Sequence, residues 1–143
     1  MKFVLSILSL ALLSVVSLAD DKADDWKKLK GTWVVDKAFV NGGDSTEQLK
    51  NVKLTIEEGK YTADFAGEKD AGKLDLDPAK KPKAMNIEST EGANKGKKIQ
   101  AIYEITGDSL KVAYSFKDDE RPKSLEPKEG DNQLVVVYKR EKK

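Results

Sequence analysis

Hydrophobic and polar residues alternate along most of the chain. Val52, Leu54 and Ile56, for example, alternate with Lys53 and Thr55, a period of two that is typical of half-buried antiparallel strands. Clusters of Gly, Pro, Asn and Asp separate such segments and indicate turns. The pattern predicts eight strands, at residues 31–39, 52–57, 61–65, 73–77, 85–88, 99–105, 110–116 and 134–138. The last of these segments is apolar on both of its faces.

Eight consecutive amphipathic strands favour an antiparallel up-and-down β-barrel, because closure buries every inward face and removes the exposed edges. A two-sheet sandwich is the alternative. Helix is expected only in two short pieces. Residues 24–29 can form one turn before the first strand, and residues 45–48 read Ser-Thr-Glu-Gln, a capping box for a turn that ends near Lys50. The expected fold is all-β with a short N-terminal helical turn.

The order of the strands predicts which end of the barrel is open. In an antiparallel barrel, the connections after the first, third, fifth and seventh strands share one end. The longest links, residues 41–51, 89–97 and 117–131, belong to this end. The other end has two tight turns and the segment around Trp26, which we expect to close it. Because loops on a rigid scaffold often carry function, a binding mouth is expected at the long-loop end.

Residues 1–19 have the form of a signal peptide. A short positive start precedes a largely apolar stretch at residues 3–16, and residues 17–19 read Ser-Leu-Ala, a small-x-small cleavage pattern. A membrane-spanning helix needs about 20 apolar residues, and Asp20 follows here at once, so an uncleaved anchor is the weaker alternative. We expect no integral membrane span, export to the periplasm or the extracellular space, and a single barrel domain over residues 20–143.

The composition limits the possible chemistry. The chain has 143 residues, with 26 Lys and Arg against 25 Asp and Glu, which indicates one domain. Loss of Lys2 with the signal peptide leaves 25 residues of each sign, so no overall field attracts nucleic acid. The absence of Cys and His removes disulfides, zinc sites built on these ligands and nucleophiles that need a His base. We expect a protein that is not an enzyme, without catalytic residues, metal or cofactor.

Clusters of charged residues are weak candidates for a binding site. The lysines of residues 80–83 and 95–98 precede consecutive antiparallel strands, so they lie at opposite ends of the barrel and cannot form one nucleic-acid footprint. The carboxylates of residues 20–25 and 118–120 lack the ligand spacing of a calcium loop. We expect all four clusters to be solvated. The inward positions contain no Asp or Glu, and their one charged residue, Lys37, is expected to reach solvent through a β-bulge or along the rim.

Several motifs resemble those of lipocalins. Residues 29–33 read Leu-Lys-Gly-Thr-Trp, the G-x-W opening that lipocalins share with fatty-acid-binding proteins, and Arg140 matches the basic residue that packs across this Trp in lipocalins. The runs at residues 76–87, 94–97 and 102–111 resemble, in order and spacing, an uncharacterised family of small lipocalin-like domains of planctomycete bacteria. The resemblance covers about residues 29–140. It implies a barrel of the calycin type and a bacterial envelope setting, and no catalytic or ligand-binding residues.

Two details of this resemblance bear on the site. A guanidinium group of Arg140 over the indole of Trp33 would be a structural contact that seals the closed end, worth about 0.5 to 2 kcal/mol. Fatty-acid-binding proteins commonly hold the ligand carboxylate with Arg-x-Tyr on the final strand, whereas residues 136–138 read Val-Val-Tyr. A fatty acid held in that manner is therefore not expected.

Two functions of different classes fit these observations. An eight-stranded barrel is just wide enough to be filled by side chains or to hold one small ligand. Eight of the nine aromatic residues after the signal peptide fall on inward positions, so we expect at most a small cavity. As a binding module, the barrel would hold a small apolar molecule at the long-loop end, lined by Phe39, Phe65, Ile99, Tyr114 and Phe116. The alternative is a filled barrel that acts as an interaction or envelope-structural protein through its surface and loops.

Overall fold

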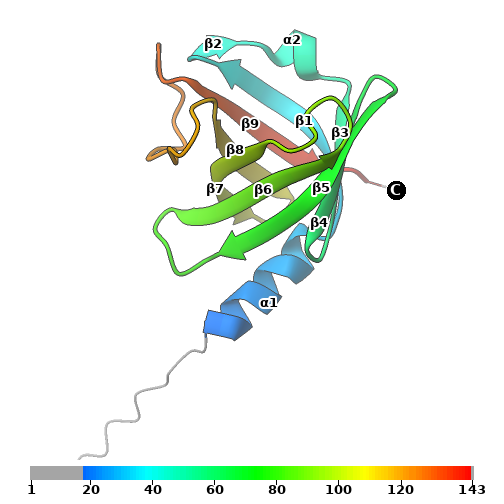
Figure 1. Cartoon of the computed structure of the whole chain (residues 1–143), viewed down its shortest axis with the longest axis vertical. Coiled ribbons are helices and arrows are strands. Elements are labelled where there is room, and N and C mark those ends of the chain that lie inside the picture. The colour runs from blue at the N-terminus through cyan, green and yellow to red at the C-terminus, as the bar shows by residue number, and fades with distance from the viewer. Residues whose placement is uncertain (1–17, 143) are drawn as a thin grey trace, which may run out of the picture.

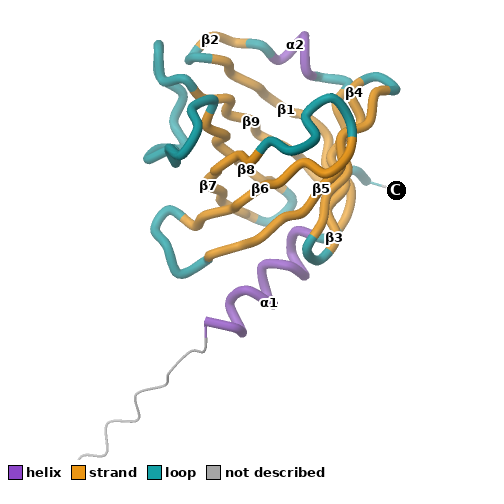
Figure 2. Tube along the Cα trace, in the orientation of Figure 1, coloured by secondary structure: helices purple, strands orange, loops and turns teal. Residues whose placement is uncertain are grey.

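The strands of this protein close into one antiparallel barrel. A computed structural model of the chain describes residues 18–142, and Figures 1 and 2 show the strands wrapped around a common interior. The strands are β1 (Gly31–Val40), β2 (Gly43–Asp44), β3 (Val52–Glu57), β4 (Lys60–Phe65), β5 (Glu68–Asp77), β6 (Lys83–Glu91), β7 (Lys98–Thr106), β8 (Ser109–Ser115) and β9 (Gln133–Arg140). The eight long strands pair in chain order, and β1 also pairs with β9, which closes the sheet. The predicted eight-stranded up-and-down barrel is confirmed, with β2 as a short addition at the end of β1.

The N-terminal helix is longer than the predicted single turn. Helix α1 (Leu18–Leu29) has 12 residues and lies at the side of the barrel opposite β2 and the short helix α2 (Thr46–Leu49) (Figure 1). Trp26 and Leu29, one turn apart on α1, are buried in the main core of the barrel. Because these two side chains cannot be buried by the helix alone, they fix α1 against the barrel and close this end, as the sequence predicts.

The predicted turn near residue 46 is present, but its capping box is not. Ser45 precedes α2 without donating or accepting a capping hydrogen bond through its side chain. The carboxylate of Asp44 takes this place, because its Oδ1 accepts a 2.9 Å hydrogen bond from the backbone N–H of Thr46. A carboxylate near a helix N-terminus satisfies a free N–H group, which is the role that the sequence assigned to Ser45.

A β-bulge in β1 changes which side chains enter the barrel. The register between β1 and β9 shifts between Val35 and Lys37, and Lys37 is exposed, as expected. The extra residue also reverses the faces beyond it. Ala38 is fully buried in the main core, whereas Phe39 turns to the outer wall. The prediction that Phe39 faces inward is therefore wrong.

The long connection between β8 and β9 folds back along the outer wall of the barrel. Leu125 from this connection packs, together with Phe39, on a second apolar cluster formed by Ile102, Ala113 and Val135. Arg121 of the same connection donates hydrogen bonds to backbone carbonyl groups of β6 and β7. This cover explains why β9 is apolar on both faces: one face packs in the barrel and the other lies under the connection.

The predicted signal peptide lies mostly at residues 1–17, outside the residues that the structure describes, so its cleavage and the start of the mature domain stay predictions. Within residues 18–142, neither helix has the length and apolar character needed to cross a membrane.

Candidate functional site

The barrel contains a cavity of about 220 Å³. The residues that line it come from the barrel wall and from the long-loop end. Those of the walls are Val35, Val52, Leu54, Ile56, Tyr61, Ala63, Asp70, Leu74, Met85, Ile87, Ile99, Leu110, Val112, Tyr114, Ser115, Leu134, Val136 and Tyr138. The rim consists of Leu49 on α2, Phe65 at the end of β4, Asn94 between β6 and β7, and Phe116 after β8.

The cavity reaches the surface at the long-loop end. Phe65 is 42% exposed and Phe116 is 55% exposed, although both line the cavity. Both rings lie at the opening of one apolar cavity, and exposed apolar surface beside a cavity suits contact with an apolar ligand or a partner. The opposite end is closed by α1, so a ligand would enter between these two rings.

Four of the five residues predicted to line the pocket do so. Phe65, Ile99, Tyr114 and Phe116 surround the same cavity, because they keep the period of two on β4, β7 and β8. Phe39 is not among the lining residues that the structure describes, since the bulge in β1 places it in the outer-wall cluster. Whether the four residues bind a ligand stays a prediction.

Two tyrosine hydroxyl groups form a pair inside the barrel. The hydroxyl oxygens of Tyr114 and Tyr138 are 2.8 Å apart, a distance typical of a hydrogen bond. Burial raises the pKa of the Tyr138 phenol to about 12. Burial also raises the pKa of Tyr114, with smaller contributions from Tyr138 and Tyr61. Both phenols are therefore neutral over the physiological range, and they form one polar spot in a largely apolar wall.

A second polar cluster lies on the opposite wall, around Asp70. The Tyr61 hydroxyl donates a 3.1 Å hydrogen bond to Oδ2 of Asp70, and the Ser89 hydroxyl donates to Oδ1. Ser89 is only 3% exposed and Tyr61 only 8%. Burial raises the pKa of Tyr61 to about 12, and Asp70 adds to this shift. A carboxylate thus faces the cavity, held by two neutral hydroxyl donors.

The expectation that no acidic residue faces inward is therefore wrong. The sequence pattern placed the start of the fourth long strand at residue 73, whereas β5 begins at Glu68. Asp70 has the same parity as the buried Leu74 and Leu76, and it lies opposite the buried Ala63 of β4. Continuing the alternation of β5 from Leu74 toward the N-terminus, through Gly72, would have found this residue.

An irregularity in the sheet brings Ser89 to Asp70. Gly72 pairs with Ser89, but Ala71 pairs with Glu91, so β6 has one extra residue at this point. The two strands approach so closely that a Cβ atom on Gly72 would collide with the backbone carbonyl of Glu88. A glycine at this position is thus required for the approach, and the polar cluster depends on it.

The closed end contains a buried carboxylate, Asp25. The expectation that the acidic cluster of residues 20–25 is solvated is wrong for this residue. Asp25 on α1 is only 2% exposed. Its carboxylate accepts a 2.7 Å hydrogen bond from the Tyr103 hydroxyl and hydrogen bonds of 2.9 and 3.1 Å from the Lys83 ammonium group. Lys83 belongs to the lysine cluster of residues 80–83, so it too has a structural partner. These contacts attach α1 to the barrel and lie away from the mouth.

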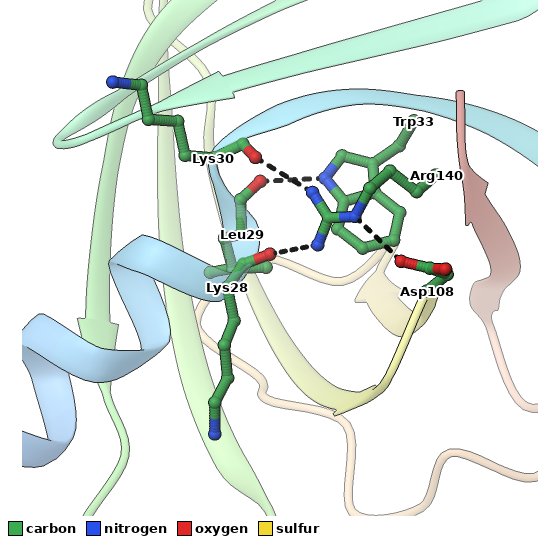
Figure 3. Close-up of polar contacts among 6 residues, drawn as sticks. All are labelled: Lys28, Leu29, Lys30, Trp33, Asp108 and Arg140. Carbon is green, nitrogen blue, oxygen red and sulfur yellow. Dashed lines mark hydrogen bonds and ion pairs between the residues drawn. The ribbon is translucent and has the colours of Figure 1, made fainter. Parts of the chain in front are cut away.

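The predicted contact of Trp33 with Arg140 is present (Figure 3). The Arg140 guanidinium carbon lies 4.3 Å from the centre of the Trp33 ring system. The guanidinium group also donates to the carbonyl oxygens of Lys28 and Lys30 and to the Asp108 carboxylate. Trp33 donates a 2.8 Å hydrogen bond to the carbonyl of Leu29. Arg140 therefore joins the last strand to the end of α1, where carbonyl groups lack partners within the helix.

Comparisons with known proteins give no relative for this chain: no family model, no curated protein and no solved structure matches it.

Proposed function

We propose that this protein is a non-enzymatic binding module that holds one small, largely apolar molecule in its barrel. The observation that carries the proposal is the cavity of about 220 Å³ that reaches the surface between Phe65 and Phe116. Its wall is apolar apart from a few polar groups, which is the usual construction of a small-molecule site. The lipocalin-like G-x-W motif and its Arg140 support the same function, because barrels with this opening commonly hold apolar ligands.

The volume limits the size of the ligand. An engineered protein cavity of about 150 Å³ binds benzene, so a cavity of about 220 Å³ suits a molecule with on the order of ten non-hydrogen atoms. Pockets for drug-sized ligands start near 300 Å³. A long-chain fatty acid exceeds this space. The Val-Val-Tyr sequence at residues 136–138 also lacks the arginine that would hold its carboxylate.

Binding of naphthalene tests the proposal, because this fluorescent molecule has the size of the cavity. We expect the purified protein to bind it with saturation at one site. Ala63→Phe should abolish binding by filling the cavity, since Ala63 lines it and is only 7% exposed. The matched control is Ala71→Phe. Ala71 lies on the neighbouring strand β5 and does not line the cavity, so this variant should bind naphthalene normally.

Each variant must retain the thermal unfolding transition of a folded barrel. Saturable binding that is unaffected by Ala63→Phe would place the probe elsewhere. No binding to the wild-type protein would contradict the proposal and favour the filled barrel that acts through its surface.

We further propose that the protein is exported, with cleavage between Ala19 and Asp20. The support is the apolar stretch and the Ser-Leu-Ala pattern of residues 3–19. Cleavage there would retain Asp25, Trp26 and Leu29, which attach α1 to the barrel. N-terminal sequencing of the protein from the periplasm or medium of an expressing bacterium should start at Asp20. Recovery only as an uncleaved chain in the membrane fraction would contradict the proposal.

A further inference from the structure

We infer that the ligand of this cavity is a small apolar amine, whose ammonium group binds Asp70. This inference rests on the proposed function and specifies the chemical class of the molecule. The charge of the cavity lining is unbalanced. Of the cavity-lining residues that the structure describes, Asp70 alone is charged, and none of them is Lys or Arg.

Asp70 has hydrogen-bond partners but no cationic partner. The ion pairs found among residues 18–142 do not include it. Its flanking lysines, Lys69 and Lys73, are exposed, and they have the opposite parity on β5, which directs them to the outer face. The contrast with Asp25 is informative, because that buried carboxylate is paired with Lys83 inside the fold.

The two hydroxyl donors leave part of the carboxylate unused. A carboxylate offers about four acceptor sites, and Tyr61 and Ser89 each occupy one, on different oxygens. These neutral donors fix the orientation of the group without neutralising its charge. A partly buried carboxylate without a counter-charge is unfavourable, and a bound ammonium ion would offset this cost while forming charge-assisted hydrogen bonds.

The remainder of the cavity suits the apolar part of such an amine. Aromatic rings of Phe65, Phe116, Tyr61 and Tyr114 line it, and aromatic faces attract cations as well as apolar groups. Asp70 pairs with Ala63, two pairs below the Phe65 and Glu68 pair at the rim. The small Ala63 side chain leaves space beside the carboxylate. An amine that enters through the mouth would therefore meet Asp70 below the rim, with its apolar end among the aliphatic side chains.

The same arrangement disfavours a carboxylic acid. An anionic ligand would place a second negative charge near Asp70 without any lining lysine or arginine to bind it, and like charges in a site of low polarity repel strongly. A neutral alcohol of the same shape would gain the apolar contacts and an ordinary hydrogen bond only. The expected order of affinity is amine, then alcohol, then carboxylate.

The test compares phenethylamine, phenethyl alcohol and phenylacetate, three molecules of nearly equal shape. Their binding to the wild-type protein is measured at neutral pH by isothermal titration calorimetry and by ligand-observed NMR. We expect the amine to bind at least about tenfold more tightly than the alcohol, as a charge-assisted hydrogen bond predicts. Phenylacetate should bind most weakly of the three.

Asp70→Asn removes the charge with little change in shape. It should weaken binding of the amine about tenfold or more and leave binding of the alcohol within about threefold. The matched control is Asp36→Asn, which removes the same charge from an exposed position of β1 and should leave the order of affinities unchanged. A thermal unfolding transition must show that both variants fold.

The outcomes separate this inference from the proposed function. Binding of the alcohol as tight as that of the amine by the wild-type protein overturns the amine inference and leaves the binding module intact, and this comparison decides even if Asp70→Asn does not fold. Equal loss of all three ligands in a folded Asp70→Asn variant would also overturn it, because the role of Asp70 would then be structural. Failure of the wild-type protein to bind any of the three ligands or naphthalene contradicts both proposals.

Discussion

The hydroxyl group of Tyr103 donates a 2.7 Å hydrogen bond to the carboxylate of Asp25, which joins a strand of the barrel to the helix that closes it. Both residues are buried, at 1% and 2% exposure. Burial raises the pKa of Tyr103 far above its usual range, and its bond to Asp25 contributes to the shift. Helix α1 is therefore an integral part of the barrel, because its removal would leave a buried phenol without an acceptor.

Asp25→Ala should destabilise the protein substantially. The change leaves the Tyr103 hydroxyl unsatisfied in the core and releases Lys83, so we expect the free energy of unfolding to fall by about 2 to 4 kcal/mol. Asp24→Ala is the matched control, because Asp24 is exposed on the same turn of α1. Its effect should stay within about 0.5 kcal/mol. Equal denaturation midpoints for the two variants would show that Asp25 contributes nothing specific.

The contact of Trp33 with Arg140 gives a second prediction. Trp33→Ala removes a fully buried side chain and should lower the free energy of unfolding by about 3 to 5 kcal/mol. Arg140→Ala should cost less, about 1 to 3 kcal/mol, because the guanidinium group is partly exposed and its acceptors can be hydrated.

Arg140→Lys should recover little of that loss, since a single ammonium group cannot contact two carbonyl oxygens, a carboxylate and a ring in one geometry. Urea denaturation of the three variants measures these differences. A midpoint near that of the wild type for Trp33→Ala would contradict the structural role of the G-x-W motif.

Buried tyrosines predict a loss of stability at alkaline pH. The pKa values of Tyr61 and Tyr138 are each raised to about 12 in the folded protein, whereas a tyrosine in the unfolded chain titrates near pH 10. Between about pH 10 and 12 the folded state therefore binds more protons than the unfolded state, and the free energy of unfolding falls as the pH rises. The stabilisation is fully present below about pH 10.

Tyr138→Phe tests this cause. It removes one of the shifted groups, so the denaturation midpoint should depend less steeply on pH above about pH 9.5 than in the wild type. In an alkaline titration, the absorbance of tyrosinate should also rise at higher pH for the native protein than for the urea-unfolded chain. Coincident absorbance curves for the two states would contradict the burial of these phenols.

The number of strands and their closure could be predicted from the sequence because they depend on local alternation. In a strand with one apolar face, every second residue is apolar and shows which face is buried. Val52, Leu54 and Ile56 mark the buried face of β3 in this way. Closure then follows from the need to bury eight such faces. The contact of Arg140 with Trp33 could be predicted because the G-x-W resemblance supplied the pairing of two distant residues.

The missed features depend on how the strands, and the helix α1, fit to one another. The sequence suggested the bulge at Lys37, but the consequence for Phe39 follows only if the parity is reversed beyond the extra residue. Asp70 was missed because Gly72 interrupts the apolar pattern of β5, and the strand was therefore predicted to start after it. In the structure Gly72 permits the close approach of β6, and the strand continues through it. Asp25 was missed because its partners, Lys83 and Tyr103, are distant in the chain.

The reversed orientation of Phe39 gives the last prediction. Phe39 packs with Leu125 on the outer wall, whereas Phe116 lines the mouth and is 55% exposed. Phe39→Ala should lower the free energy of unfolding by about 1 to 3 kcal/mol, as expected for a half-buried ring, and leave the dissociation constant of naphthalene within about twofold.

Phe116→Ala should do the opposite, with a small effect on stability and several-fold weaker binding, and Phe116→Asp should weaken binding further because it places a polar group at the apolar rim. Urea denaturation and naphthalene titration of the same preparations give both quantities for each variant. If Phe39→Ala weakened binding as strongly as Phe116→Ala while the barrel remained folded, Phe39 would contribute to the pocket, and the orientation that the bulge assigns to it would be wrong.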